Sequence, residues 1–222
     1  MKKAIIFFTR VPLPGLTKTR LIKDFSSQEA CRIHEIMLKS IFKSIKETNA
    51  DVFIYINPIE KKEVLFGLIG ENNYYPQIGQ NLNEKMKNAI FDVLDLGYDK
   101  VILLGSDLIG IDRDYLENAF ELLKDKDIVL GPVEDGGYCL IGMKKKESSP
   151  FEETKLSHGR VLENLIDRIE REDLTYGLLK EIFDVDEIDD FYKVTGNKKD
   201  IDEFERRVKW ARKKWPVQTR NV

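Results

Sequence analysis

The chain has 222 residues, of which 42% are hydrophobic and 34% are charged, and its formal net charge is -3. This length can bury one sizeable core, so we expect a single α/β domain over residues 1–222. The composition argues against binding of duplex nucleic acid, which demands a basic face, and offers no leader, membrane span or disulfide framework, so we expect a cytoplasmic protein.

Short apolar runs alternate along the chain with helical patterns, which is typical of a parallel sheet with crossover helices. Strands are predicted at residues 3–8, 51–56, 73–79, 101–104, 127–133 and 138–143. Helices are predicted at residues 26–47, 60–69, 82–93, 112–124, 158–172 and 199–215. Ser26 and Glu29 fit a capping box. We interpret His34 as a surface residue and place Leu82 on an apolar helix face.

The apolar run at residues 101–104 organises the prediction. Its four consecutive aliphatic residues lack polar alternation, which indicates a strand buried on both faces. Gly105 and Ser106 end this strand and place Asp107 at its carboxyl end. Ligands of open α/β sheets bind outside these ends, so Asp107 is a candidate for chemistry. A plain role as a turn or cap residue explains the same sequence.

The loop over residues 9–21 contains two prolines, a glycine and the cations Arg10, Lys18 and Arg20. Exposed backbone amides, the Lys18 point charge and the planar Arg20 guanidinium could cradle a phosphate. The loop is not a Walker A motif, because Thr17 rather than glycine precedes Lys18. A solvated basic loop remains the alternative.

Two further segments carry clustered chemistry. Asp135 precedes Gly136 and Gly137, which allow positive φ angles and a close backbone approach to a ligand, although an Asp-Gly hairpin turn explains the same residues. Residues 183–191 contain five acids between apolar residues but lack the glycine and the glutamate spacing of an EF-hand. Residues 150–158 are expected to be irregular.

Three segments, at residues 12–21, 103–111 and 130–143, resemble in order and spacing a bacterial family of uncharacterised transferases with the glycosyltransferase-A fold. Residues 184–191 resemble the closing acidic motif of that family. Its members are labelled glycosyltransferase or selenodomain-associated transferase, and they are similar to guanylyltransferases that act on phospholactate and on the molybdenum cofactor. The resemblance covers about residues 3–191.

The resemblance implies a three-layer α/β/α Rossmann-like sandwich, mostly parallel with one antiparallel strand, that binds a nucleotide together with Mg²⁺ or Mn²⁺. It implies that Asp107 binds the metal, that Asp135 completes the metal site or faces the acceptor, and that both acids, with Lys18, carry the catalysis. The expected nucleotide and phosphate ligands are Thr9, Gly15, Lys18, Thr19, Arg20 and Ser106. The expected acceptor-side residues are Gly136, Gly137 and Tyr138.

We therefore expect a metal-dependent transferase with a nucleotide-activated donor and a small-molecule acceptor. The family label favours a nucleotide-sugar glycosyltransferase, whereas the basic loop at Lys18 and Arg20 suits the triphosphate of a nucleotidyltransferase. A non-catalytic nucleotide-binding protein is a third possibility, against which the presence of both Asp107 and Asp135 argues. A homodimer is compatible with the sequence.

Overall fold

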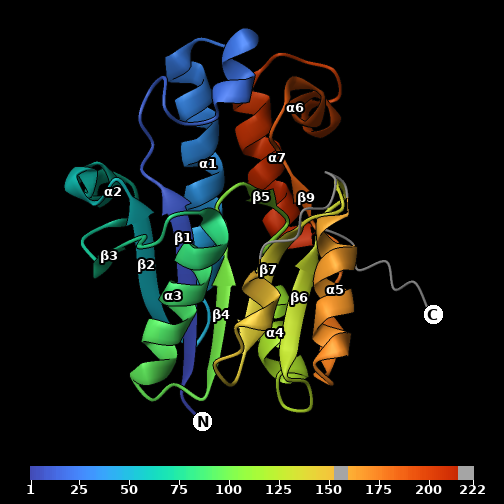
Figure 1. Cartoon of the computed structure of the whole chain (residues 1–222). Coiled ribbons are helices and arrows are strands. Elements are labelled where there is room, and N and C mark those ends of the chain that lie inside the picture. Colours follow the sequence, from blue (N-terminus) through green and yellow to red (C-terminus); the bar gives the residue numbers. More distant parts are fainter. Residues whose placement is uncertain (153–159, 215–222) are drawn as a thin grey trace.

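The computed structural model describes residues 1–152 and 160–214 and has a central sheet between two layers of helices (Figure 1). The seven strands of this sheet lie in the order β3-β2-β1-β4-β7-β6-β8. β7 runs antiparallel to both of its neighbours, and the other pairs are parallel. The expected α/β/α sandwich with one antiparallel strand is confirmed.

The elements follow one another closely along the chain. The strands of the large sheet are β1 Lys3–Arg10, β2 Asp51–Asn57, β3 Tyr74–Pro76, β4 Lys100–Leu104, β6 Ile128–Pro132, β7 Tyr138–Met143 and β8 Tyr176–Leu178. A second sheet pairs β5 Leu108–Ile109 with β9 Phe183–Asp184. The α-helices are α1 Ser27–Lys46, α2 Glu63–Ile69, α3 Leu82–Asp95, α4 Arg113–Leu122, α5 Val161–Arg171, α6 Ile188–Thr195 and α7 Ile201–Lys214. Short 3-10 helices are η1 Thr19–Lys23, η2 Ile59–Lys61 and η3 Ser149–Phe151.

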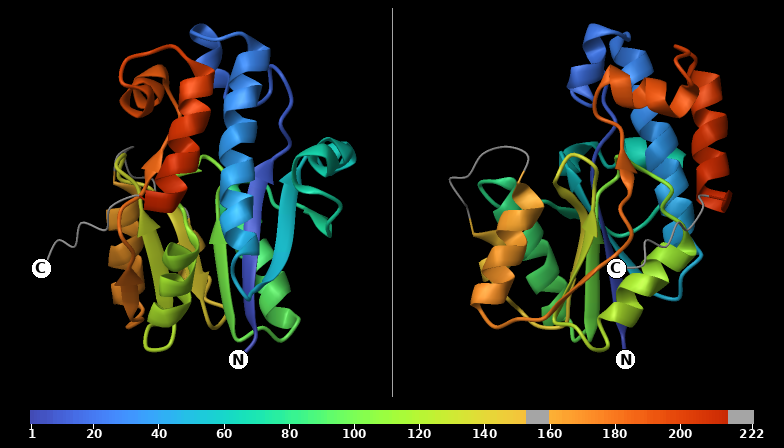
Figure 2. Two further views of the ribbon diagram at one scale, coloured as in Figure 1. Left: turned by 180° about the vertical axis from the view of Figure 1, so that it is seen from behind. Right: turned by 90° about the vertical axis from the view of Figure 1, so that its right-hand side faces the viewer.

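Alternate residues of the central strands enter two separate cores. α1 and α4 cover one face of the sheet, and α3 and α5 cover the other (Figure 2). Ile102 and Leu104 of β4 belong to the core under α1 and α4, whereas Val101 and Leu103 belong to the core under α3 and α5. This division follows from the two-residue repeat of side chains along a strand. The prediction that residues 101–104 are buried on both faces is therefore confirmed.

Side chains cap the starts of α1 and α3. Ser26 and Glu29 form the predicted capping box at α1, and Asn81 caps α3 by accepting a hydrogen bond from the Glu84 amide at 2.9 Å. Leu82 is 61% exposed, so its predicted place on the apolar face is wrong. It is the first residue of α3 and lines the cavity described below. His158, the predicted start of the α5 helix, lies outside the described residues.

A third core lies beyond the carboxyl edge of the large sheet. It joins η1, the first half of α1, β5, β9, α6 and α7, and its aromatic centre stacks Phe191 on Phe204 with ring centroids 4.9 Å apart. Residues far apart in sequence therefore meet above the strand ends (Figure 1). None of the helices within residues 1–152 and 160–214 is both long and apolar enough to cross a membrane.

The close contact of β7 with β4 at Gly142 provides a test of this packing. A Cβ at Gly142 would meet Ile102 Cγ2 at 2.8 Å, and the β-branched Ile102 has little rotamer freedom with which to yield. We expect Gly142→Ala to lower the free energy of unfolding by about 1–3 kcal/mol in urea titrations. Gly67→Ala in α2, where a Cβ meets nothing within 4 Å, is the control and should be neutral or stabilising by up to about 1 kcal/mol.

Candidate functional site

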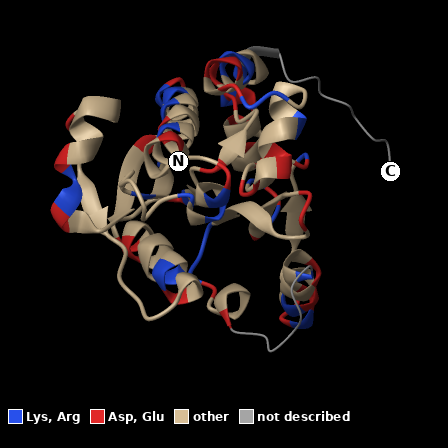
Figure 3. Cartoon of the chain, turned by 90° about the horizontal axis from the view of Figure 1, so that it is seen from above, with Lys and Arg blue, Asp and Glu red and all other residues tan. Residues whose placement is uncertain are grey.

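A cavity of about 870 Å³ opens at the carboxyl edge of the sheet, the face seen in Figure 3. Its lining includes most of the predicted site residues, namely Thr9, Lys18, Thr19, Arg20, Ser106, Asp107, Asp135, Gly137 and Tyr138. Gly15 and Gly136, although both are described, lie outside this lining. Both adopt positive φ angles, 82° each, which favour glycine in a turn.

The small β5–β9 ladder places the acids of the site. Leu108 pairs with Asp184 in antiparallel register, and the Val185 amide donates a hydrogen bond to the Asp107 carbonyl oxygen at 3.1 Å. Asp107 is thereby fixed beside the segment that carries Asp184 and Asp186. The sequence interpretation assigned no role to these two acids. The alternation of acidic and apolar residues from 183 to 186 is the signal that could have indicated a strand with one polar face.

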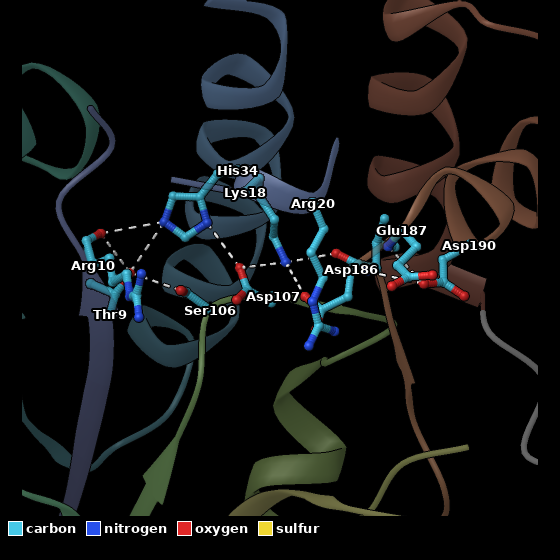
Figure 4. Close-up of polar contacts among 11 residues, drawn as sticks. Thr9, Arg10, Lys18, Arg20, His34, Ser106, Asp107, Asp186, Glu187 and Asp190 are labelled. Carbon is cyan, nitrogen blue, oxygen red and sulfur yellow. Dashed lines mark hydrogen bonds and ion pairs between the residues drawn. The ribbon is translucent and has the colours of Figure 1, made fainter. Parts of the chain in front are cut away.

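Lys18 occupies the centre of this cluster (Figure 4). Its Nζ lies 2.6 Å from the Val185 carbonyl oxygen, 2.7 Å from Asp186 Oδ1 and 3.1 Å from Asp107 Oδ1. These acceptors match the three donors of an ammonium. The side chain is 4% exposed. Lys18 lies in the predicted place, but it binds carboxylates here rather than presenting a free charge to the cavity.

The electrostatics of this cluster follow from burial and pairing. Burial by itself lowers the pKa of Lys18, but the charges of Asp107 and Asp186 outweigh it and raise the pKa above its ordinary value. For Asp107, burial raises the pKa, whereas the Lys18 charge and the hydrogen bond from His34 more than reverse this effect. The pKa of Asp107 is therefore held well below its usual range. Both groups are charged at neutral pH.

His34 is a buried part of the site, so its interpretation as a surface residue is wrong. It is 1% exposed, and its Nδ1 lies 2.9 Å from Asp107 Oδ1. Nε2 faces the Arg10 carbonyl oxygen at 3.3 Å. The signal was present in the helix repeat, because His34 follows Ala30 by four residues and precedes Met37 by three, which places all three on one face.

Thr9 and Ser106 connect the ends of β1 and β4. Thr9 Oγ1 donates a hydrogen bond to Ser106 Oγ at 2.8 Å, and the two residues are only 2% and 4% exposed. Both were predicted to bind phosphate. In this structure their hydroxyls bind one another within the cavity lining, beside Asp107.

Asp135 makes the hydrogen bond of an Asp-Gly turn and lines the cavity. Its Oδ1 accepts a hydrogen bond from the Gly137 amide at 2.8 Å, as an Asp-Gly turn requires. Its charge also acts on Asp184, whose pKa is raised to about 6 by burial and by the neighbouring charges of Asp135 and Asp186. The strand that precedes Asp135, β6, is separated from β4 by β7. Asp135 therefore reaches the Asp107 edge through the β6–β7 turn and not from an adjacent parallel strand.

The cluster has the donor chemistry for a divalent cation. Among residues 1–152 and 160–214, no three His, Cys, Asp or Glu side chains stand ready as metal ligands. Mg²⁺ needs only one or two carboxylates when substrate phosphates supply further oxygens. Burial, together with the charges of Asp135 and Asp186, raises the pKa of Asp184. Asp107 and the other acids of the cavity lining are oxygen donors of the kind that such a cation takes.

Comparisons with known proteins agree with this architecture. A family model described as "Uncharacterized protein conserved in bacteria (DUF2064)" matches residues 40–158, which include Asp107 and Asp135. The chain is 30% identical over 134 residues to 2-phospho-L-lactate guanylyltransferase of Methanocaldococcus sp. (strain FS406-22). The match covers 58% of this chain and 54% of that protein, so the chain spans about half the length of the curated relatives it matches.

Solved structures extend the likeness to nearly the whole chain. A crystal structure from Desulfovibrio desulfuricans G20, which carries the provisional name nucleotide-diphospho-sugar transferase, is 26% identical with a TM-score of 0.83. The alignment covers 95% of this chain and 99% of that one. CMP:2-keto-3-deoxy-manno-octonic acid synthetase in complex with CTP shares the fold, with 12% identity, a TM-score of 0.56 and coverage of 87% and 97%.

The raised pKa of Asp184 predicts a pH-dependent gain in stability when its charge is removed. Below about pH 4 the Asp184 carboxyl is largely protonated in both the folded and the unfolded state, so it does not affect the free energy of unfolding. Above pH 6 it is ionised in both states, and its buried negative charge raises the free energy of the folded state alone. In EDTA, Asp184→Asn should be more stable than the parent by about 1–3 kcal/mol at pH 7.5, and the gain should vanish near pH 4.

Thermal melts across this pH range would check the prediction, with Asp127→Asn as a matched control. Hydrogen bonds from Thr175 lower the pKa of Asp127, so this second substitution should destabilise the protein at pH 7.5. If Asp184→Asn changes the melting temperature equally at all pH values, ionisation of Asp184 does not destabilise the folded protein and the prediction is wrong.

Proposed function

The chain belongs to the bacterial protein family DUF2064, and we propose that it is a nucleotidyltransferase that acts on a small phosphorylated acceptor. The observation that carries this proposal is the distribution of charge in the cavity. Arg10, Arg20 and Lys85 line it from β1, η1 and α3, together with the carboxylates of Asp107, Asp135, Asp184 and Asp186. Such a cavity offers cationic groups to a polyphosphate and carboxylates to a cation.

The proposed reaction transfers a nucleoside monophosphate. A phosphate oxygen of the acceptor attacks the α-phosphorus of a nucleoside triphosphate, the bond from that phosphorus to the bridging oxygen breaks, and pyrophosphate leaves with the electron pair. The acceptor phosphate is already ionised, so the attack requires no general base. The protein therefore contributes position and charge stabilisation rather than proton transfer.

The residues of the cavity divide between these tasks. Arg20 is 67% exposed and can bind the departing pyrophosphate through its planar guanidinium. Asp135 and Tyr138, in the β6–β7 turn and at the start of β7, border the side left for the acceptor. A divalent cation, Mg²⁺ or Mn²⁺, held by Asp107 and a second acid would neutralise charge on the phosphates.

The relatives support nucleotidyl transfer over the glycosyl transfer that the family label favoured. The curated guanylyltransferase and the synthetase with bound CTP are both named for nucleotidyl chemistry. Glycosyl transfer from a nucleotide sugar remains the second candidate, because the provisional name of the Desulfovibrio protein, which aligns over nearly the whole chain, suggests such a donor.

An assay of pyrophosphate release separates the two reactions. With Mn²⁺, 2-phospho-L-lactate and GTP, CTP, UTP or ATP, we expect one triphosphate to yield pyrophosphate, with GTP as the first choice. GDP-mannose and UDP-glucose should yield no nucleoside diphosphate. Release of a nucleoside diphosphate from a sugar donor, without pyrophosphate from any triphosphate, would replace this proposal by glycosyl transfer.

The different surroundings of Asp107 and Asp135 predict different outcomes when each is replaced by asparagine. Asp107→Asn removes a partner of Lys18 and His34, so it should abolish metal-dependent triphosphate binding. It should also cost about 1–2 kcal/mol of stability, less than the 3–5 kcal/mol of a fully buried pair, because 44% of the Asp107 side chain is exposed. Asp135→Asn should change triphosphate affinity by less than about tenfold yet remove turnover. Calorimetry and thermal melts check both, and equal loss of affinity in the two variants would place Asp135 with the metal instead.

A further inference from the structure

The Lys18 ammonium stands where a metal ion bound by Asp107 and Asp186 would have to stand. We propose that Lys18 is a built-in counter-ion that keeps divalent cations off these two acids until nucleotide phosphates draw it away. This inference rests on the proposed nucleotidyl transfer and concerns how that site takes up its metal. It predicts that metal and nucleotide bind cooperatively.

The first argument is steric. Lys18 Nζ contacts Asp186 Oδ1 and Asp107 Oδ1 at 2.7 and 3.1 Å, so it lies between the two oxygens that face one another. Mg²⁺ binds carboxylate oxygens at about 2.0–2.1 Å. An ammonium and a metal ion cannot both occupy this space, and even neighbouring positions would bring their charges into strong repulsion.

The second argument concerns the backbone of Lys18. Its φ of 51° and ψ of 46° lie in the left-handed region, which is uncommon for a residue with a side chain and stores strain that clusters at switch regions. The three contacts of the ammonium accompany this backbone conformation. The lysine side chain is also a flexible four-carbon stem that can redirect its charge.

The third argument is the balance of charge. Asp107, Asp135, Asp184 and Asp186 line the cavity, and Lys18 is the cation buried among them. A bound triphosphate offers the ammonium new anionic partners in the same cavity. Movement of Lys18 onto the phosphates leaves Asp107 and Asp186 without a counter-ion at the moment when the metal can bridge them to the nucleotide. By thermodynamic linkage, each ligand then strengthens binding of the other.

The direct test measures binding of Mn²⁺ alone by electron paramagnetic resonance. Lys18→Met keeps the length of the side chain but removes its charge, so it should bind Mn²⁺ at least about tenfold more tightly than the parent, about 1.4 kcal/mol. Arg20→Met is the matched control, because Arg20 belongs to the same segment but reaches only Asp186, at 3.6 Å, from a largely exposed position. Its gain should be clearly smaller.

The same proteins give a second readout in thermal melts. Lys18→Met should melt below the parent in EDTA and recover in millimolar Mn²⁺, which should change the parent little. Lys18→Gln, which is also uncharged, serves if the methionine variant does not fold. Nucleotide titrations with and without Mn²⁺ should show a smaller effect of the metal in either Lys18 variant than in the parent, and the metal–nucleotide complex in solution cancels from that comparison.

The outcomes separate the inference from the proposed function. If neither Lys18 variant gains Mn²⁺ affinity while the parent binds triphosphate with metal, Lys18 is a fixed structural ion pair and the inference is wrong, whereas nucleotidyl transfer stands. If the parent binds no triphosphate at all, both are wrong. Tighter Mn²⁺ binding by a Lys18 variant, together with reduced coupling to nucleotide, supports both.

Discussion

The buried ammonium of Lys18 is the interaction on which the site depends. It joins the loop after β1, the end of β4 and the segment after β9, through the carboxylates of Asp107 and Asp186 and the carbonyl of Val185. A buried charge is tolerated only when its partners neutralise and hydrogen-bond it. These three acceptors meet that condition, so the position of each segment constrains the other two.

The large sheet and the third core position different residues of the site. The sheet sets the edge at which Thr9, Ser106 and Asp107 meet. The third core, with Phe191 at its centre, supports the β5–β9 ladder that brings Asp186 across from the far end of the chain. A site that combines cations and carboxylates thus results from two packing units, neither of which contains all of its side chains.

Much of the fold could be predicted from the sequence, because its signals are local. The strand at residues 138–143 and the capping box at Ser26 depend on neighbouring residues alone. The partners of Lys18 could not be predicted in this way. Asp186 lies 168 residues away, and the strands that align it have two residues each, too few for a periodic pattern. His34 was missed although the helix repeat places it on one face with Ala30 and Met37, because histidine has only an intermediate tendency to be buried and its partner Asp107 lies 73 residues away.

Lys18 and Asp186 are 168 residues apart, so they leave the ribosome at different times during synthesis. Six of the seven strands of the large sheet precede residue 144, so most of the sheet can assemble while the chain is still being made. Lys18 and Asp107 are then present without Asp186, and the carboxyl edge lacks both the β5–β9 ladder and the helices above it. Residues 183–211, which supply β9, Asp186 and the α6 and α7 side chains of the third core, must therefore be synthesised before the site can form, and shorter chains would carry the sheet with an incomplete binding edge.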